Sequence, residues 1–194
     1  MRKLILFIGA IAVMTVAFLS CSSKKQSDSA EQTQGNEGKV LVCYFSATGT
    51  TEKAAQRIAD ITGGKLYNIE PKEPYTEADL DWRDSLSRSS VEMRTKTSRP
   101  ELKDSVADLS DYSVVFIGYP NWWNTHPTII NTFIENNDLK GKTVVPFMTS
   151  GGSNIINSEK ELHESYPSLT IAKGLLMNNV SDDDIKNWLK ELGL

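Results

Sequence analysis

Short apolar or β-rich runs alternate with helix-like segments along residues 39–194. The runs predict five β-strands, at residues 39–45, 65–70, 113–118, 142–149 and 169–172. Helical spacing and helix-start signals predict helices at residues 52–61, 128–135, 153–166 and 181–192, and partly over 77–96. Gly63-Gly64 ends the first helix, and Ser181 with Asp184 three residues later predicts a capped start for the last.

Strands that alternate with helices indicate an α/β fold, here a three-layer α/β/α sandwich around a five-stranded parallel sheet. Connections between parallel strands are right-handed, which limits the possible topologies. In such sheets a ligand sits beyond the carboxyl ends of the strands, where the strand order reverses. The loops after the first, third and fourth predicted strands are therefore the candidate site.

Composition and charge narrow the class of function. The chain has 194 residues, a formal net charge of −4, two cysteines and two histidines. This mildly acidic balance disfavours a nucleic-acid partner, which would select clustered Lys and Arg. Cys21 and Cys43 stand in such different contexts that we expect no disulfide between them, and the sequence contains no metal-ligand cluster.

The first 38 residues predict an export signal and a linker. Arg2 and Lys3 precede an uncharged, largely apolar stretch, residues 4–19, which is short for a membrane-spanning helix and has the layout of a secretory signal. Residues 22–38 hold no large aliphatic or aromatic side chain, so we expect a flexible tether there. The folded domain is expected at residues 39–194.

The segment at residues 17–21 (AFLSC) resembles the bacterial lipobox, in which a Leu and a small residue precede a Cys. The resemblance implies a lipoprotein signal peptide at residues 1–20 and lipidation of Cys21, which becomes the mature N-terminus. It also implies an exported protein, periplasmic or at the cell surface, anchored to a bacterial membrane. The alternatives are a plain signal peptide with an incidental Cys and a cytosolic, membrane-anchored protein.

Residues 46–51 (SATGTT) join the first predicted strand to the first helix. Ser46, Thr48, Thr50 and Thr51 place four hydroxyls around Gly49, and the helix start adds free backbone N–H groups and partial positive charge. The loop lacks the Gly-Lys-Ser/Thr ending of a Walker loop and the spacing of a dinucleotide site, which favours a phosphate monoester. The alternative is a Ser/Thr helix cap without a ligand.

The pattern Ser46-x-Thr48-Gly49-x-Thr51 resembles the flavodoxin phosphate loop, S/T-x-T-G-x-T, with Thr50 where that family often has Asn. The resemblance extends over residues 39–194. It implies the flavodoxin-like strand order 2-1-3-4-5 and FMN as the cofactor, whose phosphate this loop, Ala47 included, would hold.

Two further loops carry unusual residues. After the third strand, adjacent tryptophans are costly to leave in water, so they would stack on a flat aromatic ligand or, alternatively, plug the core. After the fourth strand, paired glycines allow a close backbone approach and free N–H groups. The candidate residues are Pro120, Asn121, Trp122, Trp123 and Asn124 in the first of these loops, and Thr149, Ser150, Gly151, Gly152 and Ser153 in the second.

Both loops resemble those of a flavodoxin-like subfamily common among bacterial lipoproteins and proteins assigned as flavin reductases, which often has Gly in place of Asn124. The resemblance implies that residues 120–124 and 149–153 sandwich or edge the isoalloxazine ring.

Several other residues are expected to have roles that involve no cofactor. His126 is interpreted as a polar cap before a Pro-led helix rather than a flavin contact, His163 as solvated, and Cys43 as a small buried hydrophobe. Four arginines in the long second connection form either a solvated face, which we favour, or a site for an anionic partner: Arg83, Arg88, Arg94 and Arg99.

These features predict an FMN-binding redox protein that transfers electrons outside the cytoplasm, to an unknown protein or small acceptor. Because the flavin carries the chemistry, no catalytic side chain is required. Two alternatives stay open: an NAD(P)H-dependent FMN reductase of quinones or similar acceptors, and a flavodoxin-like lipoprotein that has lost FMN and acts as a binding module.

Overall fold

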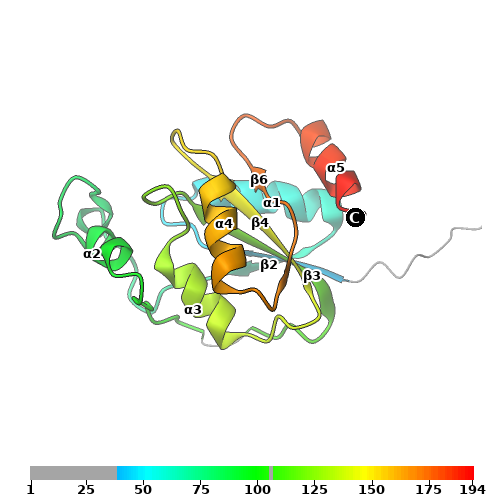
Figure 1. Ribbon diagram of the computed structural model, residues 1–194. Coiled ribbons are helices and arrows are strands. Elements are labelled where there is room, and N and C mark those ends of the chain that lie inside the picture. Colours follow the sequence, from blue (N-terminus) through cyan, green and yellow to red (C-terminus); the bar gives the residue numbers. More distant parts are fainter. Residues whose placement is uncertain (1–38, 105–106) are drawn as a thin grey trace, which may run out of the picture. The chain divides into compact units, whose positions relative to one another are not determined.

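The computed structural model describes residues 39–104 and 107–194, so the predicted signal, Cys21 and the tether at residues 22–38 lie outside the described residues. Figure 1 shows a central sheet with helices around it. The strands are β1 (Lys39–Tyr44), β2 (Lys65–Asn68), β3 (Tyr112–Pro120), β4 (Thr143–Thr149), β5 (Thr170–Ile171) and β6 (Leu175–Leu176). The helices are α1 (Thr50–Thr62), α2 (Arg88–Arg94), α3 (Thr128–Asn136), α4 (Ile156–Ser165) and α5 (Asp182–Glu191), with a short 3-10 helix η1 (Ala78–Leu80).

The sheet is parallel and has the order β2-β1-β3-β4-β5, which confirms the predicted fold class. β1 pairs with β2 on one side and with β3 on the other, so the strand order reverses between β1 and β3. The loops that follow β1, β3 and β4 leave the same edge of the sheet. This edge is where open α/β sheets bind ligands.

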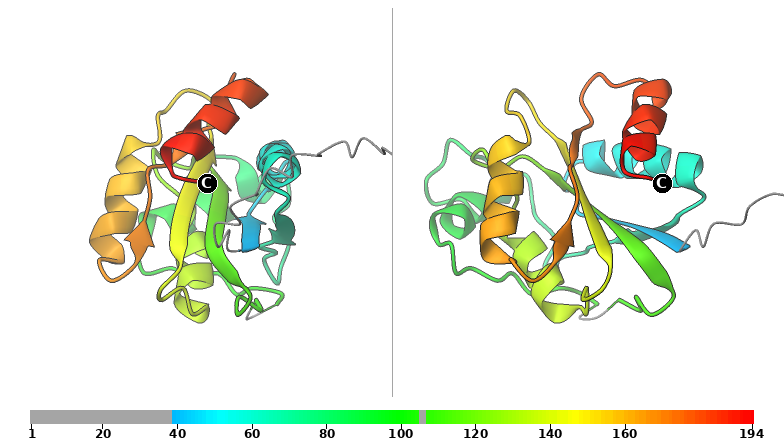
Figure 2. Two further views of the ribbon diagram at one scale, coloured as in Figure 1. Left: turned by 90° about the vertical axis from the view of Figure 1, so that its right-hand side faces the viewer. Right: turned by 45° about the vertical axis from the view of Figure 1, so that its right-hand side comes forward.

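Alternating side chains of the strands divide the core into two layers, one on each face of the sheet. Figure 2 shows the helices that lie on these two faces. Leu41, Cys43 and Phe45 belong to the layer under α3 and α4, whereas Val42 and Tyr44 belong to the layer under α1 and α5. Cys43 is fully buried, as expected of a small hydrophobe, and burial raises the pKa of its thiol. Both faces of β1 are therefore closed, and only its ends are open to a ligand.

The predicted helix ends are confirmed where strong signals exist. Gly63 ends α1 in a left-handed conformation, with φ 67°. At the start of α5, the Asp184 N–H donates to Ser181 Oγ at 3.1 Å, and the Ser181 N–H donates to the Asp184 carboxylate at 2.8 Å. Within the described ranges, no helix has the length and apolar character needed to cross a membrane.

Gly118 allows β3 and β4 to pack closely. It pairs with Phe147 across the two strands, and a Cβ built on Gly118 would overlap the Phe147 ring. Because that ring is fully buried, any larger residue at position 118 would displace it from the core. Gly118 therefore sets how the loops after β3 and β4 leave the sheet.

Pro146 explains why two short strands pair with the outer side of β4: β5, within the strand predicted at residues 169–172, and β6, which lies beyond that range. β5 pairs with Val144 and β6 with Phe147 and Met148, while Pro146 lies between them in β4. Pro146 has no N–H to offer an edge strand, so the ladder breaks there. The chain passes the gap at Gly174, where a Cβ would lie 2.6 Å from the Pro146 carbonyl oxygen.

The connection between β2 and β3 forms a lobe, defined here as residues 71–102. A bridge between Pro71 and Leu102 closes its base, with the Lys72 N–H donating to the Glu101 carbonyl at 2.8 Å. Helix over residues 77–96 is confined to η1 and α2, in line with the partial helix predicted there. A long connection with little regular structure is unusual inside a compact domain and is often functional.

Candidate functional site

The loop after β1 presents an uncapped helix start. Gly49 occupies the N-cap of α1 with φ 82°, and no side chain caps the helix. Thr48 and Thr50 are exposed, and the Ser46 hydroxyl is buried without a hydrogen-bond partner among the described residues. Since the Ser/Thr cap weighed from the sequence is not formed, the first N–H groups of α1 are available to an anion or to water.

Glu52 is the one acidic residue in the first turn of α1. Its carboxylate accepts a hydrogen bond from the Tyr44 hydroxyl at 3.3 Å. Burial, followed by the charge of Glu52, raises the pKa of Tyr44, so this hydroxyl keeps its proton and remains a donor. The Glu52 carboxylate thus has one hydrogen-bond donor, which comes from the last residue of β1.

Thr149, the last residue of β4, joins the three site loops. Its hydroxyl lies 2.8 Å from the Thr51 hydroxyl, and both residues are buried. Its carbonyl accepts a hydrogen bond from the Asn121 N–H at 2.7 Å. The loops after β1, β3 and β4 therefore converge on one residue, as the topology predicts.

The loop after β3 ends in a tight turn around Trp123 and Asn124. Trp122 and Thr125 exchange two backbone hydrogen bonds, of 2.9 and 3.0 Å, and the two central residues have φ of 46° and 65°. Two left-handed central residues define a type I′ turn, for which Asn and Gly are suited. Asn124 suits its position in this turn, whereas Trp123 is left in a strained conformation.

The two tryptophans have different environments. Trp122 is half-buried, and its ring packs edge-on against Phe45 at 5.6 Å and Tyr75 at 5.3 Å between centroids. Trp123 points outward, with 46% of its surface exposed. Trp122 therefore packs the loop onto Phe45 and Tyr75, while the indole of Trp123 is accessible to solvent or to a ligand.

The loop after β4 is held from two directions. Ser150 Oγ accepts hydrogen bonds from the Gly152 and Ser153 N–H groups, at 3.1 and 2.8 Å. The Ser150 N–H donates to Asn178 Oδ1 at 2.8 Å, and Asn178 Nδ2 donates to the Ser150 carbonyl. Of the paired glycines, only Gly151 therefore keeps an N–H that makes no hydrogen bond to another described residue.

Sequence reasoning missed three residues that position these loops. Asn178 clamps Ser150, and Asn157 Nδ2 donates to the Asn124 carbonyl at 3.0 Å. Tyr75 packs on Trp122 from the lobe. An asparagine far away along the chain carries no local signal for a loop clamp, whereas Tyr75 could have been found as an aromatic residue in a long polar connection.

His126 is a buried member of a polar network, so its interpretation as a helix cap is wrong. Pro127 occupies the N-cap of α3, and no side chain caps that helix. His126 Nε2 donates to Asn131 Oδ1 at 3.0 Å, because an amide oxygen can only accept. Its Nδ1 lies 3.1 Å from Ser158 Oγ, which is itself 2.9 Å from the Tyr119 hydroxyl. The network fastens the turn after β3 to α3 and α4.

Two hollows flank the converging loops. One, of about 380 Å³, lies beside the loop after β1 and is lined by residues that include Ser46, Ala47 and Tyr75. The other, of about 510 Å³, is lined by Trp123 and Thr125 of the turn together with Met93 and Lys96 of the lobe. The first hollow therefore adjoins the loop after β1, whereas the second lies between the turn after β3, the lobe and residues of α3 and α4.

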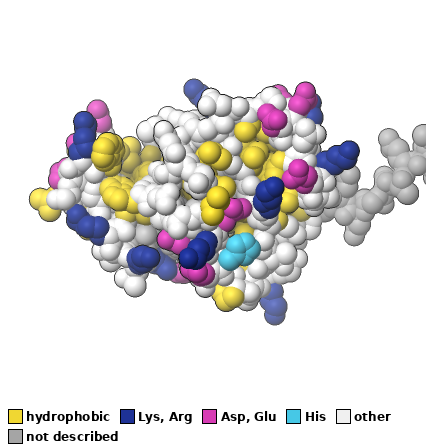
Figure 3. All heavy atoms as spheres, turned by 45° about the horizontal axis from the view of Figure 1, so that its top comes forward, with side chains coloured by type: hydrophobic (Ala, Val, Ile, Leu, Met, Phe, Trp, Pro, Cys, Tyr) yellow, Lys and Arg dark blue, Asp and Glu magenta, His cyan; other side chains and the backbone are white. Residues whose placement is uncertain are grey.

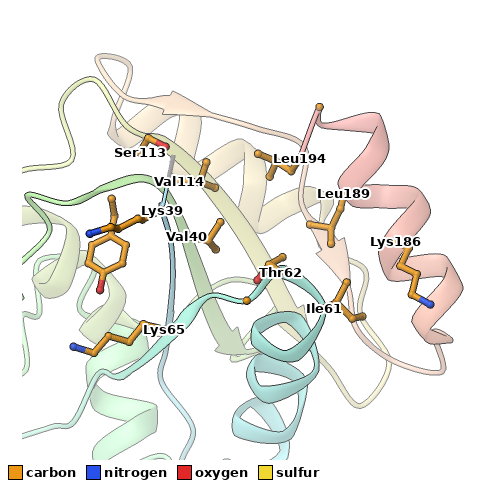
Figure 4. Close-up of a pocket in the computed structure, with 13 residues that line it drawn as sticks. Lys39, Val40, Ile61, Thr62, Lys65, Ser113, Val114, Lys186, Leu189 and Leu194 are labelled. Carbon is orange, nitrogen blue, oxygen red and sulfur yellow. The ribbon is translucent and has the colours of Figure 1, made fainter. Parts of the chain in front are cut away.

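A larger hollow, of about 890 Å³, lies at the opposite edge of the sheet (Figure 4). Its walls include Lys39, Lys65 and Lys186 around an apolar floor formed by Val40 and Leu189, among others. None of the predicted site residues lines it. Size alone does not make it the functional site, because the converging loops and the uncapped helix lie at the other edge.

Comparison with known proteins gives the family. Residues 39–192 match the family model described as flavodoxin. The chain belongs to the flavodoxin family. Among curated proteins, none matches this chain.

Solved structures of two candidate flavoproteins are similar to this chain. A candidate flavoprotein from Bacteroides uniformis is 53% identical, with a TM-score of 0.76, and the match covers 79% of this chain and 98% of that one. One from Bacteroides eggerthii is 52% identical, with a TM-score of 0.79 and coverage of 81% and 99%. Because nearly all of each solved chain is matched, both consist of this domain alone, which shows that such a domain folds by itself.

A more distant structure shares the fold. The flavoprotein from Lactobacillus acidophilus, solved in complex with FMN, is 23% identical with a TM-score of 0.61, and the match covers 78% of this chain and 99% of that one. This flavodoxin-like likeness concerns the fold, so the ligand of the present domain is argued below from its own residues.

His126 makes the flavodoxin domain sensitive to mild acid. Burial lowers the pKa of His126 below its ordinary value of 6.5. Below about pH 6.5 the unfolded chain therefore takes up a proton that the folded domain resists, and the free energy of unfolding falls by up to about 1.4 kcal/mol per pH unit. Urea unfolding at several pH values between about 7 and about 5.5 measures this slope.

Two histidine variants provide the control. His126→Gln removes the slope attributed to the buried imidazole, whereas His163→Gln, at an exposed position on α4, retains it. An equal pH dependence in both variants would contradict the assignment to His126.

Proposed function

We propose that this flavodoxin-family domain binds FMN at the loops after β1, β3 and β4 and serves in electron transfer. The observation that carries the proposal is the uncapped start of α1 at Gly49, placed beside two other loops by the contacts of Thr149. A helix start of this kind binds a phosphate without needing a lysine. The charged phosphate of FMN matches the loop after β1, and its flat ring matches the loops after β3 and β4.

The phosphate of FMN fits the loop after β1. Thr48 and Thr50 have exposed hydroxyls beside the first N–H groups of α1, and the Ser46 hydroxyl nearby lacks a partner among the described residues. The left-handed Gly49 lets the backbone curl around the anion. Thr51 acts indirectly, because its buried hydroxyl bonds Thr149 and keeps this loop next to the others.

The ring of FMN fits between the other two loops. Trp123 offers an exposed indole for stacking, while Trp122 supports the turn from below. Asn121 Oδ1 is buried without a partner, and the Gly151 N–H makes no hydrogen bond to another described residue, so both suit the polar edge of a flat heteroaromatic ring. Bound FMN supplies reversible transfer of one or two electrons, and these residues orient it and exclude water from one side.

We further propose that the domain works outside the cytoplasm, attached to a membrane through a lipid on Cys21. The support is the sequence: an uncharged apolar stretch at residues 4–19 ends at the lipobox-like residues 17–21. The 17 residues that separate Cys21 from β1 would span at most about 60 Å when extended, enough to let the domain turn.

A threonine variant tests the phosphate assignment. In the domain of residues 39–194, Thr48→Ala is expected to weaken FMN binding about 10- to 100-fold, because a hydrogen bond to a charged group contributes about 1.5–3 kcal/mol. Quenching of flavin fluorescence measures the affinity. Riboflavin, which lacks the phosphate, is expected to bind both proteins equally.

Thr62→Ala, at the other end of α1, is the matched control and should leave FMN affinity unchanged. If Thr48→Ala bound FMN as tightly as the unaltered domain, the phosphate would have to lie elsewhere.

A cysteine variant tests the anchor. The full chain, produced in a bacterium fed a labelled fatty acid, should incorporate label and sediment with membranes. Cys21→Ala should lose both properties, while Cys43→Ala should retain them because Cys43 is buried in β1. Label that persists in Cys21→Ala would refute lipidation at this residue.

A further inference from the structure

Four buried side-chain polar atoms of the described residues have no hydrogen-bond partner. Two of them, Ser46 Oγ and Asn121 Oδ1, lie in the loops proposed to hold FMN. The other two are the hydroxyls of Thr128 and Thr132, which lie one turn apart on α3 and are 5% and 7% exposed. A buried polar group without a partner costs free energy, so such groups point to a missing water molecule or ligand.

Each of the two threonines lines a hollow where α3 meets the lobe. Thr128 lines the seam hollow, defined here as the space of about 510 Å³ between the lobe, the turn after β3, α3 and α4. Thr132 lines a neighbouring hollow of about 370 Å³, and Arg99 belongs to both linings. The seam hollow has the volume of a small-molecule pocket, which is far more than one water molecule needs.

The walls of the seam hollow combine apolar groups with a few polar ones. Trp123 of the turn, Met93 of the lobe and Tyr166 after α4 supply two rings and a thioether. Aromatic and thioether side chains pack well on a flat apolar ligand. This composition, with a small number of placed polar groups, is typical of small-molecule sites.

The charged side chains in and beside the lining balance one another. Three basic side chains stand against three acidic ones: Lys96, Arg99 and Lys160 against Glu135, Glu161 and Glu164. Arg99 donates two hydrogen bonds of 2.8 Å to the Glu135 carboxylate. Figure 3 likewise shows acidic and basic side chains interspersed on the face that it draws. Because no charge of one sign prevails, the hollow favours an uncharged ligand over a cation or an anion.

Among the buried and half-buried side chains of this hollow, the groups without partners can donate hydrogen bonds. Both oxygens of the Glu161 carboxylate accept from neighbouring side chains, at 2.7 and 3.3 Å. Asn131 Oδ1 accepts from His126 Nε2, whereas Asn131 Nδ2 makes no hydrogen bond to another described residue. This amide and the Thr128 hydroxyl therefore suit a ligand that brings an acceptor oxygen.

We propose that the seam hollow is a second small-molecule site, which takes an uncharged aromatic molecule bearing a carbonyl oxygen. The ring lies against Trp123 and Met93, and the oxygen accepts hydrogen bonds from the Thr128 hydroxyl and Asn131 Nδ2. Of the residues proposed to contact FMN, Trp123 alone lines this hollow, so the second site adjoins the FMN site and shares nothing with its phosphate loop. The proposal does not rest on FMN binding.

Acetophenone, which has one ring and one carbonyl oxygen, is the probe. It is titrated into the isotope-labelled domain of residues 39–194, without FMN, while the amide signals are followed by nuclear magnetic resonance. Shifts are expected around Trp123 and Thr128, with a Kd of about 1 mM for so small a ligand. Benzylammonium, a cation with donors only, and benzoate, an anion, are expected to bind about 5-fold more weakly or less.

Threonine variants give the matched comparison. Thr128→Val removes a hydroxyl that has no partner, so the free energy of unfolding should stay the same or rise, while acetophenone binding weakens about 3- to 10-fold. Thr132→Val removes the same group from the smaller hollow, whose lining has no aromatic residue, and should leave binding unchanged. Trp123→Gly, which suits the left-handed turn, should weaken binding by removing the indole.

Several outcomes would overturn the proposal. They are no binding of acetophenone, equal affinity in Thr128→Val and Thr132→Val, shifts confined to the phosphate loop around Gly49, and tighter binding of either charged probe. A loss of stability in Thr128→Val without acetophenone binding would overturn it in favour of ordered water in the hollow.

A separate titration with FMN distinguishes the two proposals. Acetophenone binding by a domain that fails to bind FMN would retain the second site and refute the proposed function. FMN binding without acetophenone binding would do the reverse.

Discussion

The contacts of Thr149 are the constraint on which the site depends. Its hydroxyl and carbonyl contact Thr51, at the start of α1, and Asn121, in the loop after β3, and both residues are far from Thr149 in sequence. Gly118 sets the approach of β3 to β4, and Pro146 opens the outer edge of β4 to a second short strand whose following loop supplies Asn178. Packing within the sheet thus determines the positions of the hydroxyl, amide and backbone N–H groups in the three loops.

The aromatic residues at this edge of the sheet are of two kinds: three pack on one another, and one is exposed. Phe45, Tyr75 and Trp122 pack on one another and hold the loop after β3 and the lobe together. Trp123 is held in a left-handed conformation by the turn and remains exposed. Strain of this kind is commonly found where a side chain must face a ligand. The lobe adds a surface of its own beside that ligand site, which a simple crossover helix would not provide.

Sequence patterns predicted the architecture well because burial on both faces of β1, β3 and β4 leaves a plain apolar signature. The capping box at Ser181 and the end of α1 at Gly63 also follow from local chemistry. The second short strand, β6, was not predicted, since the break between β5 and β6 depends on the missing N–H of Pro146 in the neighbouring strand. The environment of His126 was missed because its partners, Asn131 and Ser158, come from two later helices.

The central claim is that FMN occupies the loops after β1, β3 and β4. The most direct measurement is nuclear magnetic resonance of the isotope-labelled domain, residues 39–194, during a titration with FMN. The account predicts the largest amide shifts at Gly49, Thr50 and Gly151, saturating at one equivalent, with little change around Lys65 at the opposite edge. Shifts confined to that opposite edge, or no shifts at all, would contradict it.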